Sequence, residues 1–241
     1  MDFKKNIKAQ FHNIQNVPYQ EVWDFQTSLH ESVKKSKKFL TSSKNKLSLL
    51  NHIVFCEHLP VFTLGKSAKD FNFQQSKEDL TAKGFEIFSI NRGGDITYHG
   101  PGQITGYVIL DLELLYRDVH KYVRNLEQAV INVLAHYDIV GQRLDDFTGV
   151  WIKDSKKEAY RKICAIGVHL SRWVSMHGIG FNINPDLSHF NNIIPCGIDD
   201  ANKSVTSLAQ ELGKELSLRV VQEQLLKELC HIFEIEIVNP S

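Results

Sequence analysis

The stretch KICAIGVHLSRWVSMHGIGFNI, residues 162–183, decides the fold of this chain. It holds two apolar runs, residues 162–170 and 173–183, separated by only two polar residues. This pattern predicts two long strands joined by a short turn. A shorter apolar run, VWI at 150–152, precedes them across the charged connection KDSKKEAYR, which we interpret as a solvated hairpin loop. The sequence therefore predicts three consecutive strands in the middle of the chain.

Helical periodicity occurs in separate blocks on either side of these strands. Apolar residues recur at helical spacing in residues 18–40, in 119–137 and again in 221–233. Strand pairs joined by short turns, with helices in blocks of their own, are typical of an α+β fold rather than a doubly wound one. We predict a mixed β-sheet with flanking helices in one domain, residues 1–241, with a small C-terminal lobe from about 203 as the alternative.

Shorter elements fill the region between the first two helical blocks. Residues 47–56 are predicted to form a buried strand, followed by a short VFTLG segment at 61–65. A brief helix is expected at 76–83, ending at a glycine, and a strand at 85–90. The glycine-rich segment NRGGDITYHGPGQ then leads into the apolar run 104–112, which is typical of a buried strand.

Composition excludes several classes of protein. The 241 residues are 42% hydrophobic and 23% charged, with 28 basic and 28 acidic side chains, which is typical of a globular protein. The balanced charge gives no overall attraction to nucleic acid or to an anionic membrane. No apolar run is long enough to cross a bilayer, and the N-terminus lacks a signal peptide. We therefore expect a cytoplasmic protein whose cysteines are free thiols.

Cys196 is the leading candidate for a reactive group. It stands between Pro195 and Gly197 in NNIIPCGID. Proline fixes its own backbone angle and glycine permits angles closed to other residues, so the thiol is expected on a tight turn. A buried cysteine that only fills space is the alternative. A reactive thiol needs a neighbouring cation or base, because the thiolate is the nucleophile.

Lys162 is the leading candidate for that cation. It begins an apolar strand, where a lysine is out of keeping with its neighbours unless it lies at the mouth of the strand. The alternative is that its side chain simply extends to water. His99 in TYHGPG and His177 in SMHGIG are competing candidates, since either could pair with a cysteine as in a protease.

Cys164 lies two residues from Lys162, so alternation along a strand predicts that both side chains face the same side. We nevertheless interpret Cys164 as a buried strand cysteine, because ICAI is continuously apolar. No histidines or cysteines stand at metal-ligand spacing, so no metal site is expected.

Residues 92–103, RGGDITYHGPGQ, have the composition of a binding loop. Gly93 and Gly94 permit close approach of backbone to a ligand, and Arg92 is suited to an anion or a carbonyl. The segment matches neither the phosphate loop nor the dinucleotide fingerprint, so it predicts no nucleotide.

Several ordered motifs resemble those of the octanoyltransferases of lipoate biosynthesis, which belong with the biotin and lipoate protein ligases. The motifs are RGGDITYHGPGQITGYVILDL (92–112), GVWI (149–152), KICAIGVHLSRWVSMHGIGFNIN (162–184) and FNNIIPCGI (190–198). The resemblance implies the fold of those ligases. It also implies octanoyl transfer from octanoyl-acyl carrier protein to a lysine of lipoyl domains, those of 2-oxoacid dehydrogenases and the glycine cleavage H protein.

Site residues follow from the same resemblance. Cys196 matches the acyl-carrying thiol of the family, and Lys162 matches the lysine that lowers its pKa. The implied substrate-binding residues are Arg92, Gly93, Gly94, Asp95, Ile96, Thr97, Tyr98, His99, Ala165, Ile166, Gly167, Gly178, Ile179 and Gly180. The resemblance implies no cofactor, no metal, no nucleic acid or membrane partner, and a cytoplasmic monomer. The family pattern has alanine at Gly180, leucine at Phe181, alanine at Cys164 and proline at Val108, so the preferred acyl length stays open.

Three other functions remain compatible with these residues. An ATP-dependent lipoate or biotin ligase would share the fold and need ATP but no cysteine. A hydrolase with a cysteine–histidine pair would release free acid. A catalytically inactive adaptor for the carrier protein would use Cys196 only structurally.

Overall fold

The computed structural model describes residues 7–40, 50–68, 72–154, 158–194 and 202–238. Its main sheet contains the strands β1 (Ile7–Val17), β2 (Asn51–His58), β6 (Gln103–Ile109), β7 (Gly141–Leu144), β8 (Phe147–Lys153), β9 (Tyr160–Ser171), β10 (Val174–Asn182), β11 (Lys203–Val205) and β12 (Ile235–Ile237). They lie in the order β12-β1-β2-β6-β10-β9-β8-β7, and β11 pairs with β9. Parallel and antiparallel pairs both occur, so the mixed sheet predicted from the sequence is confirmed.

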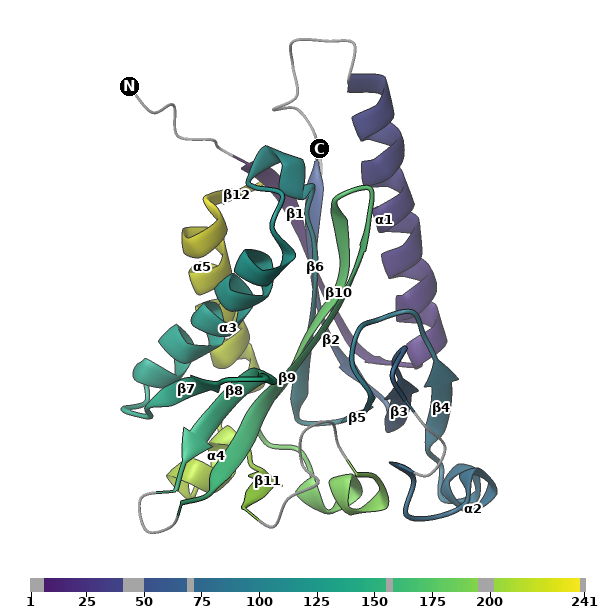
Figure 1. Cartoon of the computed structure of the whole chain (residues 1–241), viewed down its shortest axis with the longest axis vertical. Coiled ribbons are helices and arrows are strands. Elements are labelled where there is room, and N and C mark those ends of the chain that lie inside the picture. Colours follow the sequence, from purple (N-terminus) through teal and green to yellow (C-terminus); the bar gives the residue numbers. More distant parts are fainter. Residues whose placement is uncertain (1–6, 41–49, 69–71, 155–157, 195–201, 239–241) are drawn as a thin grey trace.

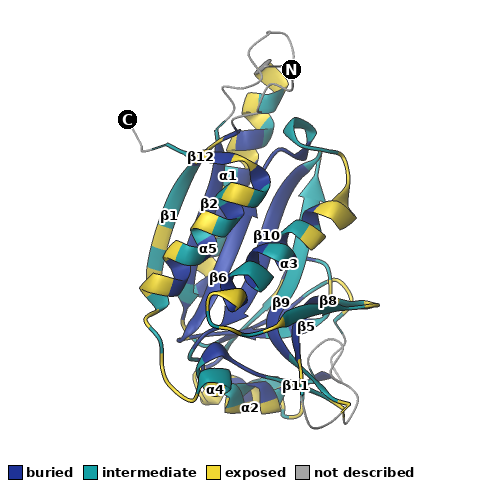
Figure 2. Cartoon of the chain, turned by 90° about the vertical axis from the view of Figure 1, so that its left-hand side faces the viewer, coloured by how far each residue is buried: buried dark blue, intermediate teal, exposed yellow. Residues whose placement is uncertain are grey.

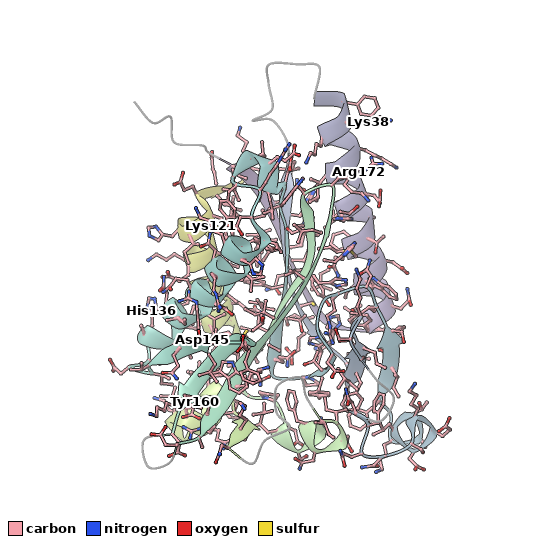
Figure 3. All side chains as sticks on the ribbon, viewed as in Figure 1. Lys38, Lys121, His136, Asp145, Tyr160 and Arg172 are labelled. Carbon is pink, nitrogen blue, oxygen red and sulfur yellow. The ribbon has the colours of Figure 1, made fainter. Side chains whose placement is uncertain are left out.

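The predicted hairpin forms the centre of this sheet. β9 and β10 pair antiparallel from Val174 opposite Ser171 to Phe181 opposite Cys164. Arg172 and Trp173 form the connecting turn, and both have positive φ angles, 52° and 64°. Two-residue hairpin turns match the twist of the strands when both residues adopt positive φ. In Figure 3, Tyr160 is the first residue of β9, the long strand of this hairpin, and Arg172 follows its last residue, Ser171.

Helices cover both faces of the sheet (Figure 1). α1 (Tyr19–Leu40) lies on one face, and α3 (Val119–Ala135) and α5 (Leu218–Phe233) lie on the other. Along β2, Ile53 and Phe55 pack into the core under α3 and α5, whereas Val54 and Cys56 pack toward α1. A strand buried on both faces has a continuous apolar run, which explains the predicted strand here. Figure 2 shows the central strands buried between helices whose outer faces are exposed.

A second, three-stranded sheet lies beside the main one. It consists of β4 (Glu86–Ser89), β3 (Val61–Leu64) and β5 (Ile96–His99), in that order, with α2 (Lys77–Ala82) beside it. The hydroxyl of Ser76 accepts a hydrogen bond from the Asp79 N–H and so caps the predicted helix α2. The glycine-rich segment is only partly a loop, because its ITYH portion pairs with β3 as strand β5.

The two ends of the described chain meet in the main sheet. β12 pairs parallel with β1, and β11 pairs parallel with β9. Side chains of α5, and of α4 (Leu208–Leu212), belong to the same apolar core as α3. The C-terminal helices therefore share one apolar core with α3, and the single domain stays a prediction. Among the described residues, no helix is both long and apolar enough to cross a bilayer.

Candidate active site

A cavity of about 380 Å³ lies along β9 and β10 and beside residues 92–99. Its walls include Lys162 and all but one of the predicted substrate-binding residues: Arg92, Gly93, Gly94, Asp95, Ile96, Thr97, His99, Ala165, Ile166, Gly167, Gly178, Ile179 and Gly180. The volume falls in the range of small-molecule sites, roughly 300–1,000 Å³. The predicted binding segments, which lie far apart in the sequence, therefore line one cavity.

Tyr98 is the predicted binding residue that does not line this cavity. Its side chain is fully buried among Phe62, Phe85 and Phe190, and its hydroxyl lies 2.7 Å from Nδ1 of His189. Side chains alternate along a strand, so Tyr98 points away from the side on which Thr97 and His99 reach the cavity. Tyr98 therefore belongs to the apolar core of the small sheet and not to the wall of the cavity.

Arg92 is held by the small sheet. Its Nη2 donates to the backbone oxygen of Thr63 at 2.6 Å and to the Thr63 hydroxyl at 3.0 Å. The side chain is 7% exposed, so its charge stands in a largely desolvated wall. Gly65 and Gly167 allow this packing: an added Cβ would lie 2.8 Å from Nη1 of Arg92 and 2.8 Å from the oxygen of Gly93, respectively. Such distances are closer than side-chain carbons tolerate.

His99 and His177 both line the cavity, and both are buried. Nδ1 of His99 lies 2.6 Å from Oε1 of Gln103, and Nε2 of His177 lies 2.8 Å from Oδ1 of Asn91. With each amide oxygen as acceptor, the ring N–H lies on Nδ1 of His99 and on Nε2 of His177. Burial lowers the pKa of both imidazoles to about 3. Groups with so low a pKa are poor general bases near neutral pH, which weakens the cysteine–histidine alternative.

Lys162 lies in the wall of the cavity, near the start of β9. Its side chain is 8% exposed, so the ammonium does not simply extend to water. The Nζ atom stands 4.6 Å from the centroid of the Trp151 ring, on the neighbouring strand β8. A cation over an indole face is electrostatically favourable. The predicted lysine is thus in the wall of the cavity, in contact with an aromatic ring.

Cys164 does not share this wall, contrary to the alternation expected from its spacing to Lys162. The register of β8 and β9 shifts between Val150 and Trp151: Val150 pairs with Cys164, and Trp151 pairs with Lys162. The extra residue between them, Ile163, interrupts the two-residue period. Cys164 is fully buried in the core, as its apolar neighbours predicted, and burial raises the pKa of its thiol well above the ordinary value. Cys196 and its turn lie outside the described residues.

Other cavity residues carried no usable signal in the sequence. Tyr19, Tyr107, Phe147, Thr148 and Val205 line the cavity from four different elements or turns. Tyr107 also contacts a buried imidazole, since its hydroxyl lies 2.8 Å from Nε2 of His58. Phe147 and Thr148 come from the start of β8, in the run DDFTG ahead of the predicted VWI strand. Only the tertiary fold brings these side chains together.

The arrangement suits a substrate with an apolar chain and a reacting polar end. Apolar side chains such as Ile90, Ile166, Val168, Ile179 and Phe190 form much of the wall. Its polar groups include the cation of Lys162, the guanidinium of Arg92 and the imidazoles of His99 and His177. Among the described residues, no group of three or more histidine, cysteine, aspartate or glutamate side chains is placed to hold a metal ion.

Comparison with known proteins shows the family to which this fold and cavity belong. The model of the lipoyl protein ligase A/B catalytic domain matches residues 18–230. An octanoyltransferase of Cytophaga hutchinsonii is 47% identical over 227 residues, which cover 93% of this chain and 92% of that protein. The chain belongs to the lipoyl protein ligase A/B family, with the octanoyltransferases within it. It is accordingly an acyltransferase, as predicted.

Solved structures confirm the predicted fold. The bipartite lipoate protein ligase of Thermoplasma acidophilum has a TM-score of 0.67 at 13% identity, covering 98% of this chain and 87% of that one. A lipoate-protein ligase A bound with ATP has a TM-score of 0.63 at 14% identity, covering 98% and 88%. At these identities the likeness concerns the fold alone.

Proposed function

We propose that this chain transfers an octanoyl group from octanoyl-acyl carrier protein to a lysine of a lipoyl domain, through a thioester on Cys196. The acceptors would be the lipoyl domains of 2-oxoacid dehydrogenases and the glycine cleavage H protein, and the enzyme would act as a cytoplasmic monomer. The observation that carries the proposal is the cavity that gathers the predicted binding segments around Lys162. Membership of the family, with close octanoyltransferase relatives, supports the choice of acyl group.

The proposed first step moves the acyl group onto the enzyme. The Cys196 thiolate attacks the thioester carbonyl of the donor, a new carbon–sulfur bond forms, and the bond to the carrier sulfur breaks. The released carrier thiolate takes up a proton from the Lys162 ammonium, which leaves Lys162 neutral for the second step. The ammonium of Lys162 would favour the thiolate form of Cys196 by charge attraction, because an opposite charge nearby stabilises an ionised thiol.

In the second step, the acceptor lysine attacks the thioester on Cys196. A carbon–nitrogen bond forms, the carbon–sulfur bond breaks, and the amine gives up one proton as the amide appears. Lys162 in its neutral form would accept that proton as general base. The low pKa of His99 and of His177 supports Lys162 in this role over either imidazole. An amide is more stable than a thioester, so the sequence of steps needs no ATP.

The test is a transfer assay with purified lipoyl domain as acceptor, read by the mass of the intact domain. Octanoyl-acyl carrier protein without ATP should yield the octanoylated domain, and free octanoate without ATP should yield none. Modification only with free octanoate plus ATP would replace this proposal with the ligase. Release of free octanoate, with an unmodified acceptor, would indicate the hydrolase instead. An enzyme inactive in all these tubes would fit the adaptor.

A further inference from the structure

The ring of Trp151 forms the surface against which Lys162 lies. Trp151 is fully buried, and it pairs directly with Lys162 across the β8–β9 ladder. The ammonium nitrogen of Lys162 stands 4.6 Å from the centre of the ring. Two contacts fix the position of the indole. Its Nε1 donates to the backbone oxygen of Phe147 at 3.2 Å, and the Phe147 ring packs edge-on against it with the ring centroids 6.1 Å apart.

The hairpin that carries Trp151 is itself anchored to α3. Glu127, fully buried, accepts hydrogen bonds from the Gly149 N–H at 3.0 Å and from Arg143 Nε at 3.0 Å. Gly149 lies close to the lysine, since a Cβ built there would be 3.5 Å from Cε of Lys162. β8 therefore presents to Lys162 a fixed surface made of the indole of Trp151 and the backbone at Gly149.

A fixed indole face acts on a lysine in two ways. It limits the positions that the flexible four-carbon side chain adopts, and it favours the charged ammonium over the neutral amine. Both effects matter for Lys162, because its proposed role depends on its charge and on its position. Other ionisable groups line the same cavity, namely Arg92, Asp95, His99, Asp146 and His177. Behind it, Cys164 interacts electrostatically with Lys162 and with Glu127, and Lys203 on β11 lies over the Phe147 ring.

We propose that Trp151 is the positioning residue of Lys162: its indole face holds the ammonium at the cavity wall and keeps it charged. Trp151 acts through Lys162 and does not itself touch the substrate. The effect of Trp151 on octanoyl transfer rests on the function proposed above for Lys162. The contact between indole and ammonium has its own readout.

The test measures the protonation of Lys162 directly. Competitive labelling of the full chain with acetic anhydride at a series of pH values, followed by peptide mass spectrometry, gives the pH midpoint at which Lys162 becomes reactive. Trp151→Leu should move this midpoint down by about half a unit to one and a half units, because the charged form loses its partner. Trp151→Phe keeps a weaker π face and should move it less. Trp173→Phe, an aromatic change at the β9–β10 turn, is the matched control and should move it by no measurable amount.

Stability and transfer complete the experiment. Trp151→Leu empties a fully buried site, so Trp151→Phe is the variant to rely on if the leucine variant fails to fold. In transfer assays, the alkaline limb of the rate should move down in pH with the labelling midpoint. An unchanged midpoint in folded Trp151→Phe and Trp151→Leu would overturn the inference. A midpoint that moves while the wild type transfers no octanoyl group would support the contact and refute the proposed function, so the two failures are distinguishable.

Discussion

Replacing Glu127 by alanine should destabilise the protein strongly, because this carboxylate joins α3 to the β7–β8 hairpin. The side chain is fully buried, and it accepts from Arg124 Nη1 at 2.8 Å, Arg143 Nε at 3.0 Å and the Gly149 N–H at 3.0 Å. Alanine would leave the buried Gly149 N–H without an acceptor, which costs about 1–3 kcal/mol. It would also break two ion pairs.

The ion pairs contribute less than a fully buried pair would. Removing one partner of such a pair costs roughly 3–5 kcal/mol, but Arg124 and Arg143 are 48% and 32% exposed and regain water. The combined loss for Glu127→Ala is therefore about 3 kcal/mol. For a chain of this size, that lowers the Tm by roughly 6–12 °C. Glu127→Gln keeps an acceptor for Gly149 and should lose about half as much.

Thermal unfolding followed by circular dichroism measures this effect. Glu223→Ala is the control, because Glu223 is 64% exposed and pairs with Arg219 on the surface of α5. Exposed pairs of this kind contribute about 0.3–0.5 kcal/mol, so the control should melt within about 2 °C of the wild type. A Glu127→Ala variant as stable as this control would refute the account of how the hairpin is held.

Further predictions concern the site and its surroundings. Lys162→Ala should raise the pH at which the nucleophilic thiol alkylates, measured by the rate of iodoacetamide labelling; an unchanged profile would remove the lysine from the mechanism. Gly149→Ala should cost at least about 2 kcal/mol in urea unfolding, since φ is +127° and a Cβ would lie 2.5 Å from the oxygen of Cys164. Because the pKa values of His99 and His177 are lowered to about 3, the unfolded chain binds protons there below about pH 6.5 and the folded chain does not. Stability should thus fall as pH drops from about 6.5 toward 3, by about 2 kcal/mol per histidine at pH 5; urea midpoints equal at pH 7.5 and pH 5 would contradict this.

The central hairpin was predictable because its signal is local. Two apolar runs separated by two residues allow only a tight turn, and Arg172 and Trp173 form it with positive φ. That turn lacks the usual asparagine or glycine, so the position of the turn was predicted from the two flanking apolar runs and not from the turn residues themselves. The helices were predictable for a similar reason, since each buries one apolar face at helical spacing.

The first strand was missed because only its first half alternates clearly. In β1, Ile7 and Ala9 are buried and Lys8 is exposed, but none of the remaining residues is buried, near the edge of the sheet. Its partners β2 and β12 are distant in sequence, and parallel pairing with them leaves no local mark. In the hairpin β7–β8 the reason is different: the first strand, β7, is short and only half-buried, so it shows no clear alternation.

Within the site, the sequence predicted the segments but not the direction of every side chain. Alternation failed at Cys164, because a single bulged residue, Ile163, shifts the register opposite Trp151. Along β5, by contrast, regular alternation holds, and it explains why Tyr98 points away from the cavity while Thr97 and His99 line it. Tyr19 and Phe147 reach the cavity from distant elements, so only packing in three dimensions reveals them.

The most direct test of the central claim is the intact mass of the enzyme after mixing with octanoyl-acyl carrier protein, without ATP. The wild type should gain one octanoyl group, Cys164→Ser should gain it as well, and Cys196→Ser should gain none. Addition of a lipoyl domain should discharge the adduct and move the octanoyl group to the domain. A wild type that gains no mass, or an adduct that persists in Cys196→Ser, would contradict the account.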